Sequence, residues 1–232
     1  MAKVGRRIIG DDVVNQIHRA GVGPLGVVVP AHPANRCHQF HPVGKPGKGD
    51  GGTGCTTDYW GNDRVNDHYI HNGRWEEQSR GGFEGDVFFD AAMQFIRENK
   101  GQPFFTYLAL YNPHSPCSIP DPKQAEAYPG KNVPVDFYAT IARIDENLGR
   151  LRQFLKEEGL ADNTLLLFLT DNGGTAGVKI YNAGMRGGKV SVHEGGGRVP
   201  LFMRWPAAKW KPHIVKPIVA HIDLYPTLLD LC

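Results

Sequence analysis

The stretch LLLFLTDNGG, residues 165–174, decides the predicted fold, because an uninterrupted apolar run ends abruptly in an acid, an amide and two glycines. A run without polar alternation is typical of a strand that is covered on both faces, as strands in parallel sheets are. Ligand sites of such sheets lie beyond the carboxyl ends of the strands, which is where Asp171 and Asn172 stand. The same residues also suit an ordinary turn, since Asn and Gly adopt positive φ at little cost. The neighbouring segments are needed to distinguish a ligand-binding site from an ordinary turn.

Two helices and a second strand are predicted upstream. Residues 83–102 predict a helix with Asp86 as a possible N-cap and Gly101 after its end. The aromatic run 103–111 predicts a buried strand, and residues 134–158 predict the longest helix, with Pro134 near its start and Gly159 as its stop. The apolar stripes of the two helices are Val87, Phe88, Ala91, Ala92, Phe95 and Ile96 in the first, and Tyr138, Ile141, Ile144, Leu148, Leu151 and Leu155 in the second.

This order of strand, helix and strand predicts a βαβ unit. Its two strands would be parallel and joined by a right-handed crossover. His114, just past the end of the first strand, and Asp171, just past the end of the second, are then expected at the same edge of the sheet. Two polar groups of different chemistry at one ligand-binding edge favour a site over a simple turn.

A glycine-rich loop and a short helix follow. The loop carries five charged or titratable residues and leads into a predicted strand at 199–204; these residues are Arg186, Lys189, His193, Glu194 and Arg198. Its glycines would let backbone N–H groups and a lysine approach an oxyanion closely, although the spacing is not that of a P-loop. The final stretch predicts a helix capped by Asp223 with Pro226 in its first turn.

Composition excludes several classes of protein. With 41% hydrophobic and 22% charged residues, the 232-residue chain is a globular protein of one large or two small domains. A formal net charge of +2 without a basic cluster gives no argument for nucleic-acid binding. The chain has no apolar run of about 18 residues and no sustained apolar segment near Met1, so neither membrane insertion nor a signal peptide is indicated. The four scattered cysteines indicate neither a disulfide framework nor a zinc ribbon.

The first 50 residues are set apart by their Gly, Pro and His content. We expect an irregular segment here, and the cluster Cys37, His38 and His41 lacks the fourth ligand that a zinc site needs. This segment also contains two adjacent aspartates, Asp11 and Asp12, in the stretch IIGDDVV.

Asp171 and Asn172 offer neighbouring oxygen ligands, which suit a hard cation, calcium or magnesium, better than zinc or copper. Calcium takes about six to eight ligands, so the remainder would come from elsewhere in the chain, from an anionic substrate or from water. A cation, a lysine and a histidine around one pocket favour hydrolysis of an ester whose transition state carries negative charge.

Five blocks in this order resemble the formylglycine-dependent sulfatases, the arylsulfatase family of the alkaline-phosphatase-like superfamily. The blocks, which together cover about residues 51–232, are DYWGNDRVNDHYIHNGRWEE (58–77), PFFTYLALYNPHSP (103–116), TLLLFLTDNGG (164–174), GMRGGKVSVHEGGGRVPLFMRWP (184–206) and HIDLYPTLLDL (221–231). The resemblance implies a mixed, mostly parallel sheet flanked by helices and an activity as a sulfuric ester hydrolase. It also implies calcium bound in part by Asp171 and Asn172, a sulfate group held by Lys189, and His114 as proton donor to the leaving alcohol.

One part of the family pattern is missing. The family nucleophile is a Cys or Ser oxidised to formylglycine in a C-x-P-S-R or S-x-P-S-R motif, whereas the internal cysteines here lie in CHQFH, CTTDY and CSIPD. We therefore expect a partial catalytic domain over residues 51–232, preceded by a foreign segment 1–50, that is inactive alone. Two alternatives stay open: a non-enzymatic remnant that binds a cation or a sulfated ligand, and a phosphate ester or phosphodiester hydrolase of the same superfamily.

The resemblance also bears on partners and compartment. The implied ligand is a small-molecule or glycan sulfate ester, and a chain without early strands would self-associate through exposed sheet edges. The family is usually secreted, periplasmic or lysosomal, whereas the start of this sequence shows no signal peptide, so the compartment stays unknown.

Overall fold

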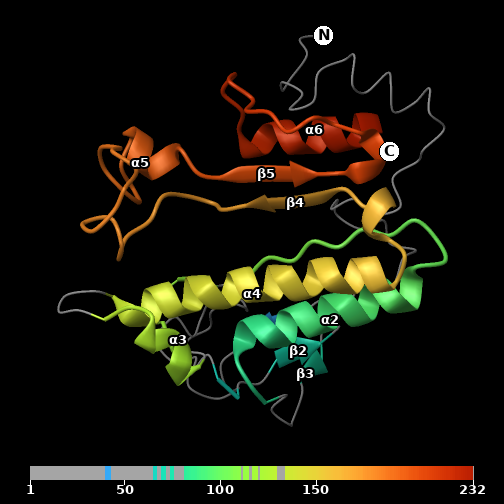
Figure 1. The fold of residues 1–232 in the computed structure, drawn as a ribbon, viewed down its shortest axis with the longest axis horizontal. Coiled ribbons are helices and arrows are strands. Elements are labelled where there is room, and N and C mark those ends of the chain that lie inside the picture. The colour runs from blue at the N-terminus through green and yellow to red at the C-terminus, as the bar shows by residue number, and fades with distance from the viewer. Residues whose placement is uncertain are drawn as a thin grey trace.

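The computed structural model describes residues 65–66, 81–110, 112–114, 117–119, 121–129 and 134–231, and the backbone of residues 40–42, 69–71 and 74–75. Figure 1 shows helices and short strands in layers, with α6, β5, β4, α4 and α2 following one another from top to bottom. The elements in chain order are β1 (Phe40–Pro42), β2 (Tyr69–His71), β3 (Arg74–Trp75), α2 (Glu84–Asn99), α3 (Pro122–Glu126), α4 (Val135–Glu157), η1 (Ala161–Asn163), β4 (Leu166–Leu169), α5 (Glu194–Gly197), β5 (Leu201–Arg204), η2 (Pro206–Ala208) and α6 (His221–Leu231).

The first three strands form an antiparallel sheet in the order β1-β2-β3. Phe40 pairs with His71 and Ile70 pairs with Trp75. The prediction of an irregular segment over residues 1–50 is therefore wrong for residues 40–42, because the partner strand lies more than 25 residues further along the chain and no local pattern marks it. Asp11, Asp12, Cys37 and His38 lie outside the described residues.

The two long helices have the predicted positions but different starts. Helix α2 begins at Glu84 with Phe83 at its N-cap, so Asp86 lies inside the first turn and the predicted cap is wrong. Gly159, with φ +73°, ends α4 as predicted. The N–H of Gly159 donates to Lys156 O at 3.1 Å and that of Leu160 donates to Leu155 O at 2.8 Å. This pair of bonds is a Schellman motif, which satisfies the last carbonyl groups of the helix.

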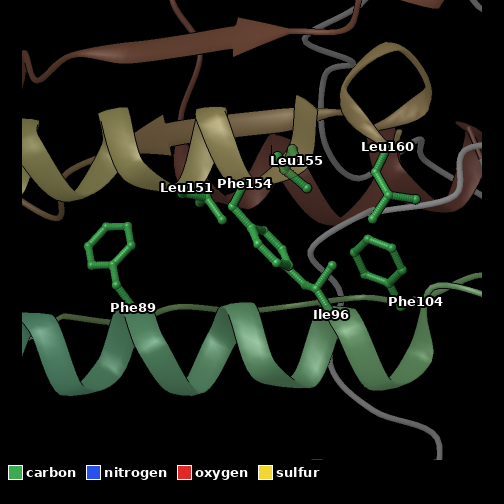
Figure 2. Close-up of a cluster of buried hydrophobic side chains, with 7 residues drawn as sticks. All are labelled: Phe89, Ile96, Phe104, Leu151, Phe154, Leu155 and Leu160. Atoms are coloured by element: carbon green, nitrogen blue, oxygen red, sulfur yellow. The ribbon is translucent and has the colours of Figure 1, made fainter. Parts of the chain in front are cut away.

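The core between α2 and α4 is apolar at its centre. Figure 2 shows Phe89 and Ile96 of α2 directed toward α4, which contributes Leu151, Phe154 and Leu155. Leu160 and Phe104 close the cluster at the end where α4 stops. Phe89, only 2% exposed, is absent from the predicted stripe. It was missed because α2 is buried on two sides: Val87 and Phe88 form a second cluster with Leu108 and Leu110.

A polar network joins the amino-terminal halves of the same two helices. Arg143 binds Asp86 in a bidentate manner, Nε to Oδ1 at 2.8 Å and Nη2 to Oδ2 at 2.6 Å, and Asn147 Nδ2 donates to Asp86 Oδ1 at 2.7 Å. This network replaces part of the apolar stripe predicted for α4, where Asn147 is buried and Ile141 is 40% exposed. Burial alone would raise the pKa of Asp86, but the hydrogen bonds from Arg143 and Asn147, together with the positive charges of Arg143 and Arg150, hold that pKa below its usual value.

Strand β4, which leads to Asp171, pairs antiparallel with β5, with Leu166 opposite Arg204 and Leu169 opposite Leu201. The stretch 103–110 contains no strand element, although Phe104, Leu108 and Leu110 pack in the apolar clusters beside α2 and α4. The described residues therefore contain no parallel pair of strands, and only single β-bridges occur at Phe104 and at Thr164, two residues before β4. An apolar run indicates that its residues are buried, but it does not indicate a strand. The apolar side chains of residues 103–110 pack against the helices without a ladder of backbone hydrogen bonds.

Helix α6 lies next to β5 in Figure 1, and its Leu228 and Leu231 pack with Leu165 and Trp205. The helix begins earlier than predicted, at His221, so Asp223 is its third residue and not its N-cap, and Pro226 lies in the helix interior. The side chain of Asp223 still accepts a hydrogen bond from Ala220 N at 2.8 Å. Across the described part of the chain, no helix combines the length and the apolar character that a membrane crossing requires.

Candidate functional site

Asp171 and Asn172 lie immediately beyond β4, as predicted. Asp171 is exposed, and its Oδ1 accepts a hydrogen bond from Thr170 Oγ1 at 3.3 Å. Asn172 is half-buried and donates from Nδ2 to the carbonyl of Gly173 at 3.1 Å. Because the amide nitrogen is engaged in this bond, the amide oxygen of Asn172 is the atom that remains for ligation.

The structure brings Lys189 to this loop. The backbone N–H of Lys189 donates to Gly174 O at 3.0 Å, and that of Gly173 donates to Gly196 O at 2.9 Å. The loop after β4 and the glycine-rich loop before β5 are thus joined by backbone bonds on both sides of the candidate site. Lys189 is half-buried at this junction. The predicted oxygen ligands and the predicted anion-binding lysine thus belong to two loops that are bonded to each other.

The glycines of these loops serve a different purpose from the predicted one. The N–H groups of Gly195 and Gly196 donate to Arg186 O at 2.8 Å and His193 O at 2.9 Å, so these donors bind protein carbonyls and not an oxyanion. A Cβ on Gly173 would overlap Gly195 O, and a Cβ on Gly196 would overlap Ser191 O. Glycine is required here because two backbone segments pack directly against each other.

The segment that follows His114 contacts the start of α4. Thr140, in the second turn of α4, donates from Oγ1 to Ser118 O at 3.1 Å, four residues after His114. On the other loop, a Cβ at Gly177 would lie 3.1 Å from Tyr138 Oη. The segment that follows His114 and the loop that follows Asn172 therefore both contact the first two turns of α4. The contacting residues are Ser118 and Gly177, so a shared site for His114 and Asp171 stays a prediction.

The donor set fits a hard cation but is incomplete within the described residues. Asp171 and Asn172 supply oxygen atoms, as calcium prefers. Among the described ranges, no three His, Cys, Asp or Glu side chains gather into a group that could hold a metal ion. Further ligands would have to be water, substrate oxygens or residues outside those ranges.

Val190, next to Lys189, is strained. Its φ is +71°, a conformation that β-branched residues rarely adopt, and its side chain is 95% exposed. Ser191 N donates to Gly188 O at 2.9 Å and closes a four-residue turn in which Val190 is the third residue. Glycine is the favoured residue at a third turn position with positive φ.

We expect Val190→Gly to raise the free energy of unfolding by about 1 kcal/mol, because the steric strain disappears without any loss of packing. The measurement is urea denaturation of the wild type, Val190→Gly and Val190→Ala. Alanine keeps a Cβ at positive φ, so its gain should be clearly smaller. Equal effects of glycine and alanine would show that the strain does not contribute.

The comparisons with known proteins identify the family. The family model described as Sulfatase matches residues 44–232, which is most of the chain. The chain therefore belongs to the sulfatase family, as the five sequence blocks predicted.

Individual relatives match a shorter part. The chain is 33% identical over 154 residues to the uncharacterized sulfatase YdeN of Escherichia coli (strain K12), a match that covers 64% of this chain and 27% of YdeN. It is 32% identical over 162 residues to an N-acetylgalactosamine-6-O-sulfatase of Bacteroides thetaiotaomicron, with coverage of 63% and 30%. The chain thus spans less than a third of the length of either relative.

A solved structure shows the same fold. The crystal structure of Ps i-CgsB in complex with k-i-k-neocarrahexaose matches with a TM-score of 0.54 and 31% identity over 60% of this chain and 31% of that chain. This likeness and the family model confirm the predicted alkaline-phosphatase-like α/β class, of which the described elements form a part. The metal and catalytic roles of His114, Asp171, Asn172 and Lys189, and the domain division at residue 50, stay predictions.

Proposed function

We propose that the chain forms part of the catalytic domain of a sulfatase that hydrolyses a sulfate ester of a carbohydrate. The observation that supports this proposal is the pair of backbone bonds, Lys189 N to Gly174 O and Gly173 N to Gly196 O, which joins the segment of Lys189 to the loop of Asp171 and Asn172. A cationic side chain and a hard cation on one anionic group are what a sulfate ester requires. Membership of the sulfatase family favours sulfate over phosphate esters.

Each residue has a proposed role in this reaction. Lys189 donates hydrogen bonds from its ammonium group to the sulfate oxygens and balances their charge. His114 donates a proton to the ester oxygen as the bond from sulfur to that oxygen breaks, so the leaving group departs as an alcohol. Asp171 and Asn172 supply two oxygen ligands for calcium, with magnesium as the other candidate. Calcium, when bound, would add positive charge beside the sulfate group.

The nucleophile is the missing component. No Cys or Ser of the 232 residues lies in a C-x-P-S-R or S-x-P-S-R motif, so a formylglycine cannot be made at the family position. Without a nucleophile the two-step displacement is not possible, and removing such a group typically costs several powers of ten in rate. We therefore propose that this chain alone binds sulfate esters without turnover. An aryl sulfate assay should show no sulfate release; release by the wild type that disappears in Lys189→Ala would contradict this.

The proposed ligand is a sulfated glycan, because one relative is an N-acetylgalactosamine-6-O-sulfatase and the similar structure holds an oligosaccharide. Calorimetric titration of a sulfated oligosaccharide in calcium buffer should show binding that Lys189→Ala weakens about tenfold or more, the usual effect of losing a charge-assisted hydrogen bond.

Lys179 supplies the matched control, since it is an exposed lysine on the same pair of loops. Lys179→Ala should leave the affinity unchanged, and the desulfated oligosaccharide should not bind to any variant. If both lysine variants lose the same affinity, the binding is non-specific attraction to positive charge and the role of Lys189 is refuted.

Self-association is also part of the proposal. Phe202 of β5 is 65% exposed, and α6 exposes Ile222 and Leu229 by 74% and 57%. Apolar groups at this exposure, next to a two-stranded sheet, favour association between copies. Sedimentation analysis should show dimers or larger species at micromolar concentration, whereas a monodisperse monomer would contradict it.

A further inference from the structure

His221 contacts the strand end that carries the candidate site. Its Nε2 lies 3.0 Å from the carbonyl oxygen of Thr170, across 51 residues of sequence. A carbonyl only accepts, so the ring nitrogen donates in this bond. Thr170 lies one residue beyond the last β4–β5 pair, Leu169 with Leu201, so its carbonyl is past the end of the ladder. The imidazole thus supplies a donor to the peptide unit that connects Thr170 to Asp171.

The start of α6 holds His221 in place. Ala220 N donates to Asp223 Oδ2 at 2.8 Å, and Asp223 N donates to Ala220 O at 2.9 Å. The first of these bonds is one half of a capping box, in which an acidic side chain reaches back to the N-cap N–H, and the second is a backbone bond of the first helical turn. Asp223 is 5% exposed, and Thr227 Oγ1 donates to its carbonyl at 2.7 Å. His221, the first residue of the helix, therefore projects from a fixed position.

We propose that His221 is a positioning residue for the candidate site: by binding Thr170 O, it fixes the backbone from which Asp171 and Asn172 present their oxygen atoms. This inference rests on the proposed function, because only that function assigns a cation site to the backbone of Asp171 and Asn172. The physical effect on the loop can be tested without any cation. The two questions can therefore be answered separately.

The experiment is native-state amide hydrogen exchange, followed by NMR, on the N–H groups of Gly173 and Lys189, whose bonds join the two loops. In His221→Ala, exchange at both amides should become about threefold to tenfold faster, the effect expected from losing one hydrogen bond. His221→Gln, whose amide nitrogen can reach the same carbonyl, should restore slow exchange. The N–H of Leu160, in the Schellman motif of α4, should be unchanged and so excludes global destabilisation.

His213 gives a matched control. It is also an exposed histidine with a ring nitrogen 2.8 Å from a carbonyl, but that carbonyl belongs to Lys211, two residues away. His213→Ala should not change exchange at Gly173 or Lys189. If His221→Ala behaves like His213→Ala, or if His221→Gln fails to restore protection, the positioning role is overturned.

A calcium titration of the same NMR samples separates the two proposals. Both proposals are supported if calcium shifts the amide signals of residues 171–174 in the wild type and binds more weakly to His221→Ala but not to His221→Gln. The loss of calcium affinity in His221→Ala should be similar in size to the increase in its amide exchange rates. If faster exchange occurs in His221→Ala but calcium has no effect on the wild type, the positioning role stands and the cation site fails. If calcium binds equally to the wild type and to His221→Ala, the proposed site stands and the positioning role is overturned.

Discussion

Replacing Phe89 with alanine is expected to lower the free energy of unfolding by about 3–5 kcal/mol, the usual cost of removing a buried aromatic side chain. Phe89 is 2% exposed and lies between α2 and α4, where it meets Leu151 and Phe154. The cost includes both the lost burial and the cavity, because the two helices are further joined by the Asp86 network and cannot close over the gap.

The measurement is chemical denaturation followed by far-ultraviolet circular dichroism, since the two long helices dominate that signal. Phe202→Ala is the matched control: it removes the same side chain at a position that is 65% exposed. Its expected cost is below about 1 kcal/mol, mainly the stacking of its ring on Phe168, 6.3 Å away. Similar losses in both variants would mean that the α2–α4 cluster is not the main core.

Asp86→Ala is expected to cost about 2–3 kcal/mol at neutral pH. The substitution removes three charge-assisted bonds at once, leaves the buried amide nitrogen of Asn147 without its acceptor and leaves Arg143 bonded only to Glu146. Asp90 provides the control one turn later on α2, because its ion pair with Arg150 has side chains that are 59% and 44% exposed. Asp90→Ala should cost less than about 1 kcal/mol.

The Asp86 effect should depend on pH. The folded-state pKa of Asp86 lies below the unfolded value of about 3.9, because of its bonds to Arg143 and Asn147. The stabilisation is therefore fully present above pH 4 and is lost as the pH falls through the folded pKa. Unfolding curves at several pH values should show the wild type and Asp86→Ala converging below about pH 4. A difference that stays constant down to pH 2 would refute the assignment.

Prediction from the sequence was correct where all the residues that determine a feature lie in one short segment. Gly159 ends α4 at the predicted residue, because helix termination depends on local φ and on the bonds of a few neighbours. The backbone of Lys189 is bonded to the loop after β4, while the shared site that the five family blocks imply stays a prediction. The α/β class was also predictable, since alternating helical and apolar segments allow few layer arrangements.

The errors concern interactions between distant segments. The run 103–110 was predicted as a strand beside β4, but it contains no strand element, because hydrophobicity indicates burial and not backbone pairing. Asp86 looked like a cap from its neighbours, yet its partners lie 57 and 61 residues away on α4. The contact between His221 and Thr170 was not predicted for the same reason, because no spacing rule links residues 51 positions apart.

The glycine junction between the two loops has a consequence for how such a protein can change during evolution. Gly173 contacts the backbone of the other loop so closely that any side chain would separate the two loops, and a side chain on Gly196 would overlap the backbone of its own loop at Ser191. Mutations at both positions should therefore be strongly selected against. Val190 and Val192, on the same loop as Lys189, are 95% and 99% exposed, so their replacement would leave the junction intact. New ligand preferences can therefore arise by drift at these two valines, while the backbone that places Lys189 is inherited unaltered.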